Sequence, residues 1–288
     1  MPPVALALVL TAALLHALWN ISAKKAGGNH HFALLSVLMT VALWAPAAIW
    51  MGTGQWQRWG VAEWGVLGAS ALAHVLYFSV LLTGYRKADL TVVYPVARGS
   101  GPLLASVGAV LILGEVVTLL GAAGILTVCA GVFLIAGGTR LWRHADPKAL
   151  AGVRWGAATG ALIAVYTVID GYAVKVLLIG PVLVDYVGNV LRVPLLALPV
   201  LRDRTGFALA CRAQWKHALV VAVLGPLGYI LVLYAVTMAP LSHVAPAREV
   251  SMLFAALIGG RLLGEGDRAL RLAGAACIAL GVMALAWA

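Results

Sequence analysis

Long apolar stretches fill most of the 288-residue chain, and short polar connections separate them. Each stretch has about the 20 residues that an α-helix needs to cross the hydrocarbon core of a bilayer. They lie at 3–23, 31–51, 61–85, 90–113, 116–138, 153–175, 178–201, 216–238, 241–263 and 270–287. Two connections, 138–152 and 202–216, are longer and more polar than the others. The pattern predicts an all-α membrane protein with about ten transmembrane helices.

The composition excludes several other classes of protein. Apolar residues make up 63% of the chain and charged residues 10%, against roughly 25% charged in ordinary soluble domains. A soluble globular enzyme, a disordered chain and a small disulfide scaffold are all inconsistent with these values. The three cysteines (Cys129, Cys211 and Cys277) are far apart in the sequence, so they indicate neither a metal site nor a redox role.

The two halves of the chain repeat each other at an offset of 150 residues. The matched positions are Arg98 and Arg248, Gly114-Glu115 and Gly264-Glu265, Gly124 and Gly274, and Gly131 and Gly281. We therefore predict a first five-helix repeat at 1–138, a linker at 139–152 and a second five-helix repeat at 153–288. Five is an odd number, so the second repeat must enter the membrane from the opposite side. Inverted repeats of this kind are an architecture of secondary transporters.

The basic residues predict the orientation of the chain in the membrane. Most of the 20 lysines and arginines fall in the odd-numbered connections, beginning with Lys24 and Lys25, whereas the even-numbered ones hold Arg58 and Lys175. The positive-inside rule then makes the odd connections cytoplasmic and both termini periplasmic in a bacterial inner membrane. This topology also explains the net charge of +10 without nucleic acid as a partner.

Six charged residues interrupt the apolar stretches, at a cost of at least about 2.5–3.5 kcal/mol for each charge near the bilayer centre. They are Arg98, Arg192, Arg248, Asp170, Asp185 and Glu249. Either these groups pair with one another as structural ion pairs, or they face a polar cavity and a ligand. The sequence leaves both alternatives open.

Two patterns among these charges favour a binding site. Asp185, Asn189 and Arg192 share one helix face by their spacing, and the positions 150 residues earlier are apolar or small, so this face could select a substrate or act as a structural clamp. Arg98 and Arg248 each follow a proline shortly before them, and a guanidinium can bind a carboxylate or phosphonate through two parallel hydrogen bonds. The alternative for these two arginines is that they extend to the lipid headgroups.

Polar-tipped rings and a few further polar groups could line the same site, although membrane helices also use such rings for packing and at the interface. These candidates are Trp19, Asn20, His74, Tyr77, Tyr94 and Tyr166. Tyr166 precedes Asp170 by about one helical turn. His74 has a pKa range that would permit protons to be the coupling ion. Glu115 and Glu265 are predicted to cap the fifth and tenth helices. Catalytic and nucleotide-binding motifs are missing from the sequence, so we predict no enzyme activity and no cofactor.

Each half also has a proline before its arginine and then the pattern G-E-x8-G-x6-G. With the opening helix ALLHALWNISAKKAG, these features resemble the drug/metabolite transporter superfamily, and its EamA-type branch in particular. The resemblance implies ten helices in two inverted repeats and transport of small molecules. Small multidrug relatives couple drug export to protons through a first-helix carboxylate. This chain has none between Pro2 and Gly28, and Asp170 occupies the matching place in the sixth helix.

We therefore expect a secondary active transporter that exports a small polar metabolite by alternating access. An amino acid or an amino-phosphonate-like zwitterion or anion would suit the mixed charge, with arginines at its acid end and carboxylates at its amine. The expected partners are the small-molecule substrate and the lipid bilayer, for a monomer or a homodimer. The alternatives are an exporter of lipophilic cations or, less favoured, a membrane protein that transports nothing.

Overall fold

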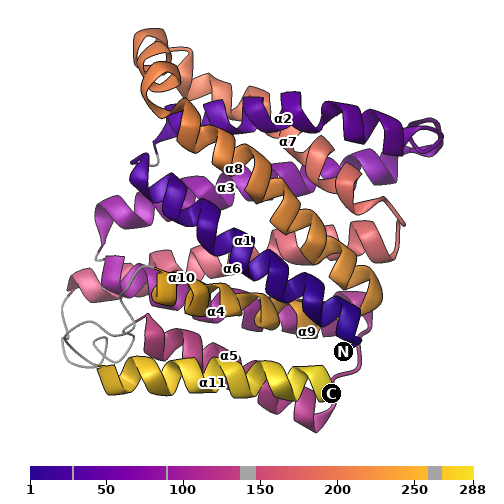
Figure 1. The fold of residues 1–288 in the computed structure, drawn as a ribbon, viewed down its shortest axis with the longest axis vertical. Coiled ribbons are helices and arrows are strands. Elements are labelled where there is room, and N and C mark those ends of the chain that lie inside the picture. Colours follow the sequence, from indigo (N-terminus) through magenta and orange to yellow (C-terminus); the bar gives the residue numbers. More distant parts are fainter. Residues whose placement is uncertain (28, 89, 137–146, 259–267) are drawn as a thin grey trace.

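The structure is a computed structural model that describes residues 1–288 except 28, 89, 137–146 and 259–267. The described part consists of helices and their connections and contains no strand (Figure 1). The first half holds α1 (Pro3–Lys25), α2 (His30–Gly52), η1 (Trp56–Arg58), α3 (Val61–Lys87), α4 (Leu90–Leu113) and α5 (Leu119–Ile135). The second half holds α6 (Pro147–Lys175), α7 (Pro181–Val200), α8 (Arg204–Met238), α9 (Leu241–Ala247), η3 (Arg248–Val250), α10 (Ser251–Ile258) and α11 (Arg268–Trp287).

These helices confirm the prediction of ten spans. In the described part, eight are long and apolar enough to cross a membrane, namely α1, α2, α3, α4, α6, α7, α8 and α11. The shorter apolar helix α5 supplies one more span, and α9, η3 and α10 follow one another as the last of the ten, which we call the ninth span from its place in the chain. Both termini lie at the same end of the bundle, which we call the termini end (Figure 1).

The predicted polar connection at 202–216 is helical from Arg204 on. Asp203 caps α8 by accepting a hydrogen bond from the backbone N–H of Gly206 at 2.9 Å, and no proline follows within the helix until Pro226. The helix therefore begins before its apolar part, at Arg204. An apolar stretch predicts only the part of a helix that crosses the membrane. The stretch at 216–238 therefore did not predict that α8 begins at Arg204.

The ninth span changes its winding where two of the embedded charges lie. Pro246 has no N–H to donate to the carbonyl of Ser242, four residues earlier. The chain then passes through the short 3-10 turn η3 at Arg248–Val250 before α10 continues. Arg248 and Glu249 therefore stand at an interruption of the helix inside the span.

The two sequence halves are interleaved in space. The most extensive helix contacts join first-half to second-half helices: α4 with α6, α5 with α11, α1 with α8, and α3 with α6. Two groups follow from the contacts. One, the α3/α4/α6 group, holds those three helices, and the other, the α1/α8/α9 group, holds α1, α8 and the ninth span. The offset of 150 residues relates them, since it matches α3 with α8, α4 with the ninth span, and α1 with α6.

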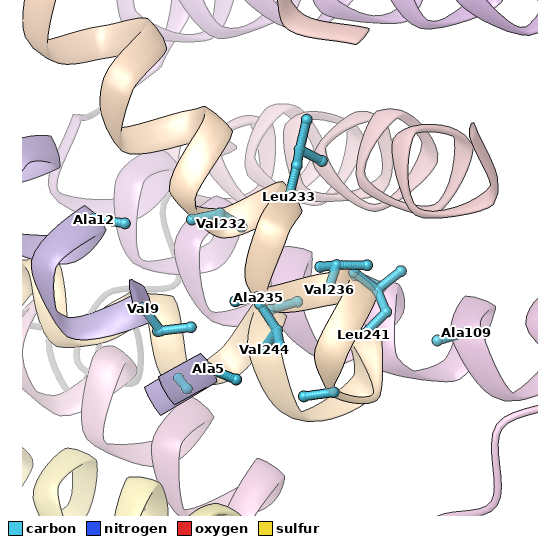
Figure 2. Close-up of a cluster of buried hydrophobic side chains, with 14 of the residues drawn as sticks. Ala5, Val9, Ala12, Ala109, Val232, Leu233, Ala235, Val236, Leu241 and Val244 are labelled. Atoms are coloured by element: carbon cyan, nitrogen blue, oxygen red, sulfur yellow. The ribbon is translucent and has the colours of Figure 1, made fainter. Parts of the chain in front are cut away.

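Small residues allow these helices to approach closely. Figure 2 shows Ala5 and Val9 of α1 beside Ala235 of α8 and Val244 of α9, all fully buried. On the side of the bundle opposite α2, α5 lies along α11 (Figure 1). A Cβ atom at Gly131 of α5 would lie 2.6 Å from the carbonyl oxygen of the facing glycine in α11, so this crossing requires glycine.

Candidate functional site

The carboxylate of Asp170 lies at the centre of the polar interior and joins three helices. Asp170 is 1% exposed, and its Oδ1 accepts a hydrogen bond from the Ser70 hydroxyl of α3 at 2.5 Å. Its Oδ2 accepts a short hydrogen bond from the phenol of Tyr229 in α8. Two neutral donors therefore stabilise this carboxylate, and the bond to Tyr229 connects the α3/α4/α6 group with the α1/α8/α9 group.

Aromatic rings cover one side of Asp170. The His74 ring stacks on Tyr166 at a centroid distance of 4.0 Å, and Tyr77 meets Tyr166 edge-on at 5.6 Å. His74 Nδ1 lies 2.9 Å from the carbonyl oxygen of Ser70, so the tautomer with a proton on Nδ1 donates there. That tautomer leaves Nε2 as an acceptor, 4.0 Å from Asp170 Oδ2. Four of the predicted candidates are thus brought together from α3 and α6.

Arg98 and Glu249 form an ion pair between the two groups. The guanidinium of Arg98 in α4 lies 2.9 Å from the carboxylate of Glu249, whose side chain is 1% exposed. Arg98 also donates to the hydroxyl of Ser251 at 3.3 Å. These two embedded charges therefore neutralise each other across the interior.

Arg248 and Arg192 behave differently from Arg98. Arg248 is 9% exposed, and no ion pair or side-chain hydrogen bond joins it to another of the described residues. Arg192 donates from Nε to the backbone carbonyl of Gly188 in its own helix at 3.0 Å. Both arginines lie close enough to Asp170 to act on its charge. Two cationic groups thus face the interior, and no described carboxylate contacts either of them.

The polar face predicted on α7 is buried and internally bonded. Asn189 donates to both the backbone oxygen of Asp185 at 2.9 Å and its carboxylate at 3.0 Å. Asp185 and Asn189 are both buried, so they face the protein interior. Arg192 follows on the same face and lies near enough to Asp185 to act on its charge. The face therefore adds a second carboxylate and a second cation to the site around Asp170.

The candidates of α1 and Tyr94 lie at the edge of this arrangement. Trp19 meets the ring of His16 edge-on at 4.9 Å, and His16 lies near Arg98 and Arg248. Asn20 is exposed and donates to a backbone carbonyl of its own helix. Tyr94 is 37% exposed. Neither Asn20 nor Tyr94 contacts the Asp170 cluster through a described hydrogen bond.

The sequence analysis did not predict three residues that hydrogen-bond to the charged groups of the site, namely Ser70, Tyr229 and Ser251. Single hydroxyl groups are common in membrane helices, where they usually bond to their own backbone. A signal existed for one of them, because Ser70 precedes His74 by four residues and so shares its helix face. No pattern marks Tyr229 or Ser251, because their partners come from other helices.

The prediction that Glu115 caps the fifth helix is wrong. Thr118 caps α5 by accepting from the backbone N–H of Gly121 at 3.0 Å. Glu115 lies in the preceding connection, where burial alone would raise its pKa. Hydrogen bonds from the Lys175 ammonium and from backbone N–H groups of the α9 start outweigh burial, so the pKa falls below its ordinary value of 4.5. The corresponding predictions for Gly264 and Glu265 lie outside the described residues.

Among the residues that the structure describes, no group of three or more His, Cys, Asp or Glu side chains could hold a metal ion.

A multi-pass bundle of two repeated halves around a charged interior is the architecture of a membrane transporter. The family model of the EamA-like transporters matches residues 3–137 and 150–287. The chain therefore belongs to the EamA-like transporter family, within the drug/metabolite transporter superfamily, whose members are transporters rather than enzymes.

Solved structures share the fold. One of them, described only as "Crystal structure of protein", is similar over 99% of this chain and 96% of its own length, with a TM-score of 0.67 and 18% identity. At that identity the likeness extends to the fold alone. A comparison with curated proteins gives no match.

Proposed function

We propose that this transporter exports a small zwitterion, such as an amino acid or an amino-phosphonate, or a small anion, across a bacterial inner membrane. The observation that carries the proposal is a pair of cations, Arg248 and Arg192, that have no ionic partner among the described residues and lie near the buried carboxylates Asp170 and Asp185.

A buried guanidinium without a counter-ion is costly, because it has lost the water that solvated it. A ligand that brings a carboxylate or phosphonate would offset this cost with charge-assisted hydrogen bonds in a two-point arrangement. Arg248 is the first candidate for this role and Arg192 the second. Arg98 is a weaker candidate than the sequence indicated, because its guanidinium already forms an ion pair with Glu249.

The amine of a zwitterion would interact with Asp170 or Asp185. Both carboxylates keep neutral donors, which stabilise negative charge without cancelling it. The rings of His74, Tyr166 and Tyr77 would then pack on the body of the substrate. The lipophilic-cation alternative would use the same rings and carboxylates but would have no role for Arg248 and Arg192, which contact no carboxylate among the described residues.

Alternating access would move the α3/α4/α6 group relative to the α1/α8/α9 group. The Asp170–Tyr229 bond and the Arg98–Glu249 pair cross between these groups. Substrate binding between them could therefore be coupled to their motion. Asp170, with His74 beside it, is our candidate for proton coupling. The basic residues at the end opposite the termini support a cytoplasmic location for that end. The export direction is proposed from the family resemblance alone.

The test uses the full chain, purified in detergent and also reconstituted in vesicles. A thermal-shift screen covers amino acids, aminophosphonates, sugars, nucleosides and quaternary amines. A ligand present at 100 times its Kd should add about 2.7 kcal/mol of stability. We expect a zwitterion or small anion to stabilise the wild type and Arg58→Gln, an exposed arginine outside the bundle, but not Arg248→Gln.

Vesicle uptake of the radiolabelled ligand then tests transport. Stabilisation by quaternary amines alone, unchanged in Arg248→Gln, would establish the lipophilic-cation exporter instead. A ligand that binds but never crosses the vesicle membrane would overturn the transporter mechanism and leave only a binding protein.

A further inference from the structure

The carboxylate of Glu115 makes its hydrogen bonds at the termini end of the bundle. Its Oε1 accepts from Lys175 Nζ and from the backbone N–H of Leu241, both at 2.7 Å. Its Oε2 accepts from the backbone N–H of Ser242 at 2.9 Å. Leu241 and Ser242 are the first two residues of α9, and their N–H groups have no partner within the helix.

These bonds join the two groups of helices. Glu115 follows α4, and Lys175 is the last residue of α6, so both belong to the α3/α4/α6 group. Leu241 and Ser242 belong to the α1/α8/α9 group. Lys175 therefore orients the carboxylate from its own side, while the two backbone N–H groups hold it from the other side.

A second bond across the same junction depends on a proline. The carbonyl of Ser242 would normally accept from the residue four positions later, but that residue is Pro246 and has no N–H. The hydroxyl of Ser106 in α4 donates to this carbonyl at 2.9 Å, and it also lies 2.9 Å from the carbonyl of Pro102 in its own helix. The start of α9 is thus bound to Glu115 through two N–H groups and to α4 through a freed carbonyl.

Packing between the groups follows the same distribution. Helix α4 packs closely on α9, the termini-end part of the ninth span. Among the described residues no comparable packing joins α4 to α10, the part of that span farther from the termini. Apart from the polar contacts of Arg98 with Glu249 and Ser251, the packing of α4 on the ninth span is therefore concentrated at α9, the helix that Glu115 binds.

We propose that Glu115 is the latch that closes the transport path at the termini end and that it must release the start of α9 when the path opens there. The proposal rests on the proposed function, because it assumes that the two groups separate during transport. A carboxylate suits this role, since its bonds to N–H groups at a helix start are charge-assisted when closed and are replaced by water when open.

The experiment measures opening directly. Ala109 of α4 is fully buried and faces the junction near Leu241 (Figure 2), so a cysteine there reacts with a charged thiol reagent only when the junction opens. The starting chain carries Ala109→Cys with Cys129→Ala, Cys211→Ala and Cys277→Ala, reconstituted in vesicles. The rate of modification by a membrane-impermeant methanethiosulfonate is compared among variants whose helix content matches that of the starting chain.

Glu115→Gln should raise the modification rate about tenfold, the equivalent of about 1.4 kcal/mol in the opening equilibrium. Glu63→Gln is the matched control, because Glu63 also accepts a backbone N–H bond at the same end, at 2.7 Å, but from Gly60 just before its own helix. That control should leave the rate unchanged. Ser106→Ala leaves Glu115 in place and should raise the rate by a smaller factor, which keeps the test open if Glu115→Gln fails to fold.

The outcomes separate the latch from the transport function. Equal modification rates in the starting chain, Glu115→Gln and Ser106→Ala would overturn the latch, whether or not the protein transports a ligand. A raised rate in a protein that transports no ligand would support Glu115 as the closing contact and overturn the proposed function instead. A rise of equal size in Glu63→Gln would also overturn the latch, because it would reflect a general loss of charge at this end.

Discussion

The ion pair between Arg98 and Glu249 should be a structural element whose two halves depend on each other. Arg98→Met would leave the Glu249 carboxylate, which is 1% exposed, without its cation. Removing one partner of a buried pair typically costs about 3–5 kcal/mol, because the remaining charge is both desolvated and unpaired. The bond from Arg98 to Ser251 adds about 1 kcal/mol to the loss.

The double variant Arg98→Met/Glu249→Gln should be less destabilised than the sum of the single variants. It removes both charges, and replacing a buried pair by neutral groups of similar size is often close to neutral. From these magnitudes we expect a coupling energy of about 2–3 kcal/mol, at the upper end of the range for residues in contact.

The assay is reversible unfolding in mixed detergent micelles, followed by circular dichroism, for the wild type, both single variants and the double variant. Arg248→Met is the matched control, because it removes a buried arginine that has no ionic partner among the described residues. Its effect on the free energy of unfolding should be within about 1 kcal/mol, or stabilising. Additive effects of the two single variants, or an Arg248→Met variant as unstable as Arg98→Met, would refute the reasoning.

Three further predictions concern packing, pH and a buried hydrogen bond. Gly131→Ala should lower the free energy of unfolding by about 1–3 kcal/mol, because its Cβ would meet backbone of α11, whereas Gly68→Ala, with open space around it, should be neutral or stabilising in the same unfolding assay. The lowered pKa of Glu115 means that its ionised form stabilises the fold above its ordinary pKa of 4.5. The stability difference between wild type and Glu115→Gln should therefore shrink as the pH falls through the depressed pKa, as unfolding measured at several pH values would show. Tyr229→Phe should cost about 1–3 kcal/mol by removing a donor from a buried carboxylate, whereas Tyr234→Phe, in the same helix, should cost less than half as much in parallel unfolding measurements.

The sequence predicted the number and order of the spans because a membrane helix requires a long apolar segment, and that requirement is local. It failed where structure extends beyond the membrane. The start of α8 at Arg204 is as helical as the rest of that helix, but its composition is polar. The prediction also failed inside one span, because the stretch at 241–263 predicts one continuous helix and the structure has the short helix α9 and the turn η3 there, with Pro246 at the point where the winding changes.

For the candidate site, the sequence named most of the buried ionisable groups but could not say which of them meet. A charge inside an apolar helix is visible in the sequence, whereas its partner depends on helix positions in three dimensions. Glu249 is adjacent to Arg248 in the chain, yet it pairs with Arg98 of another helix. Glu115 was expected to cap the helix that follows it and instead holds the start of α9, from the other half of the chain. In both cases the nearest partner in sequence is the wrong one.

The repeat explains why Arg98 forms an ion pair whereas its counterpart Arg248 forms none with the described residues. Arg98 and Arg248 occupy equivalent positions, but the residue after Arg98 is Gly99, whereas the residue after Arg248 is Glu249. The duplicated arginines therefore share one acid, which pairs with Arg98, and Arg248 has no ionic partner in the part of the chain that the structure describes. The same asymmetry appears on α7, whose charged face has no counterpart in the first half.

Among the described residues, the cations Arg248 and Arg192 and the carboxylates Asp170 and Asp185 then remain in the site, balanced in number but not joined as ion pairs. On the proposed function, a zwitterion preserves this balance, because it contributes one charge of each sign. A net anion or cation would leave an excess charge in a low-dielectric interior, where such an excess is costly. The unpaired balance of charge thus favours a zwitterion over either singly charged alternative, and departures from the repeat symmetry create that balance.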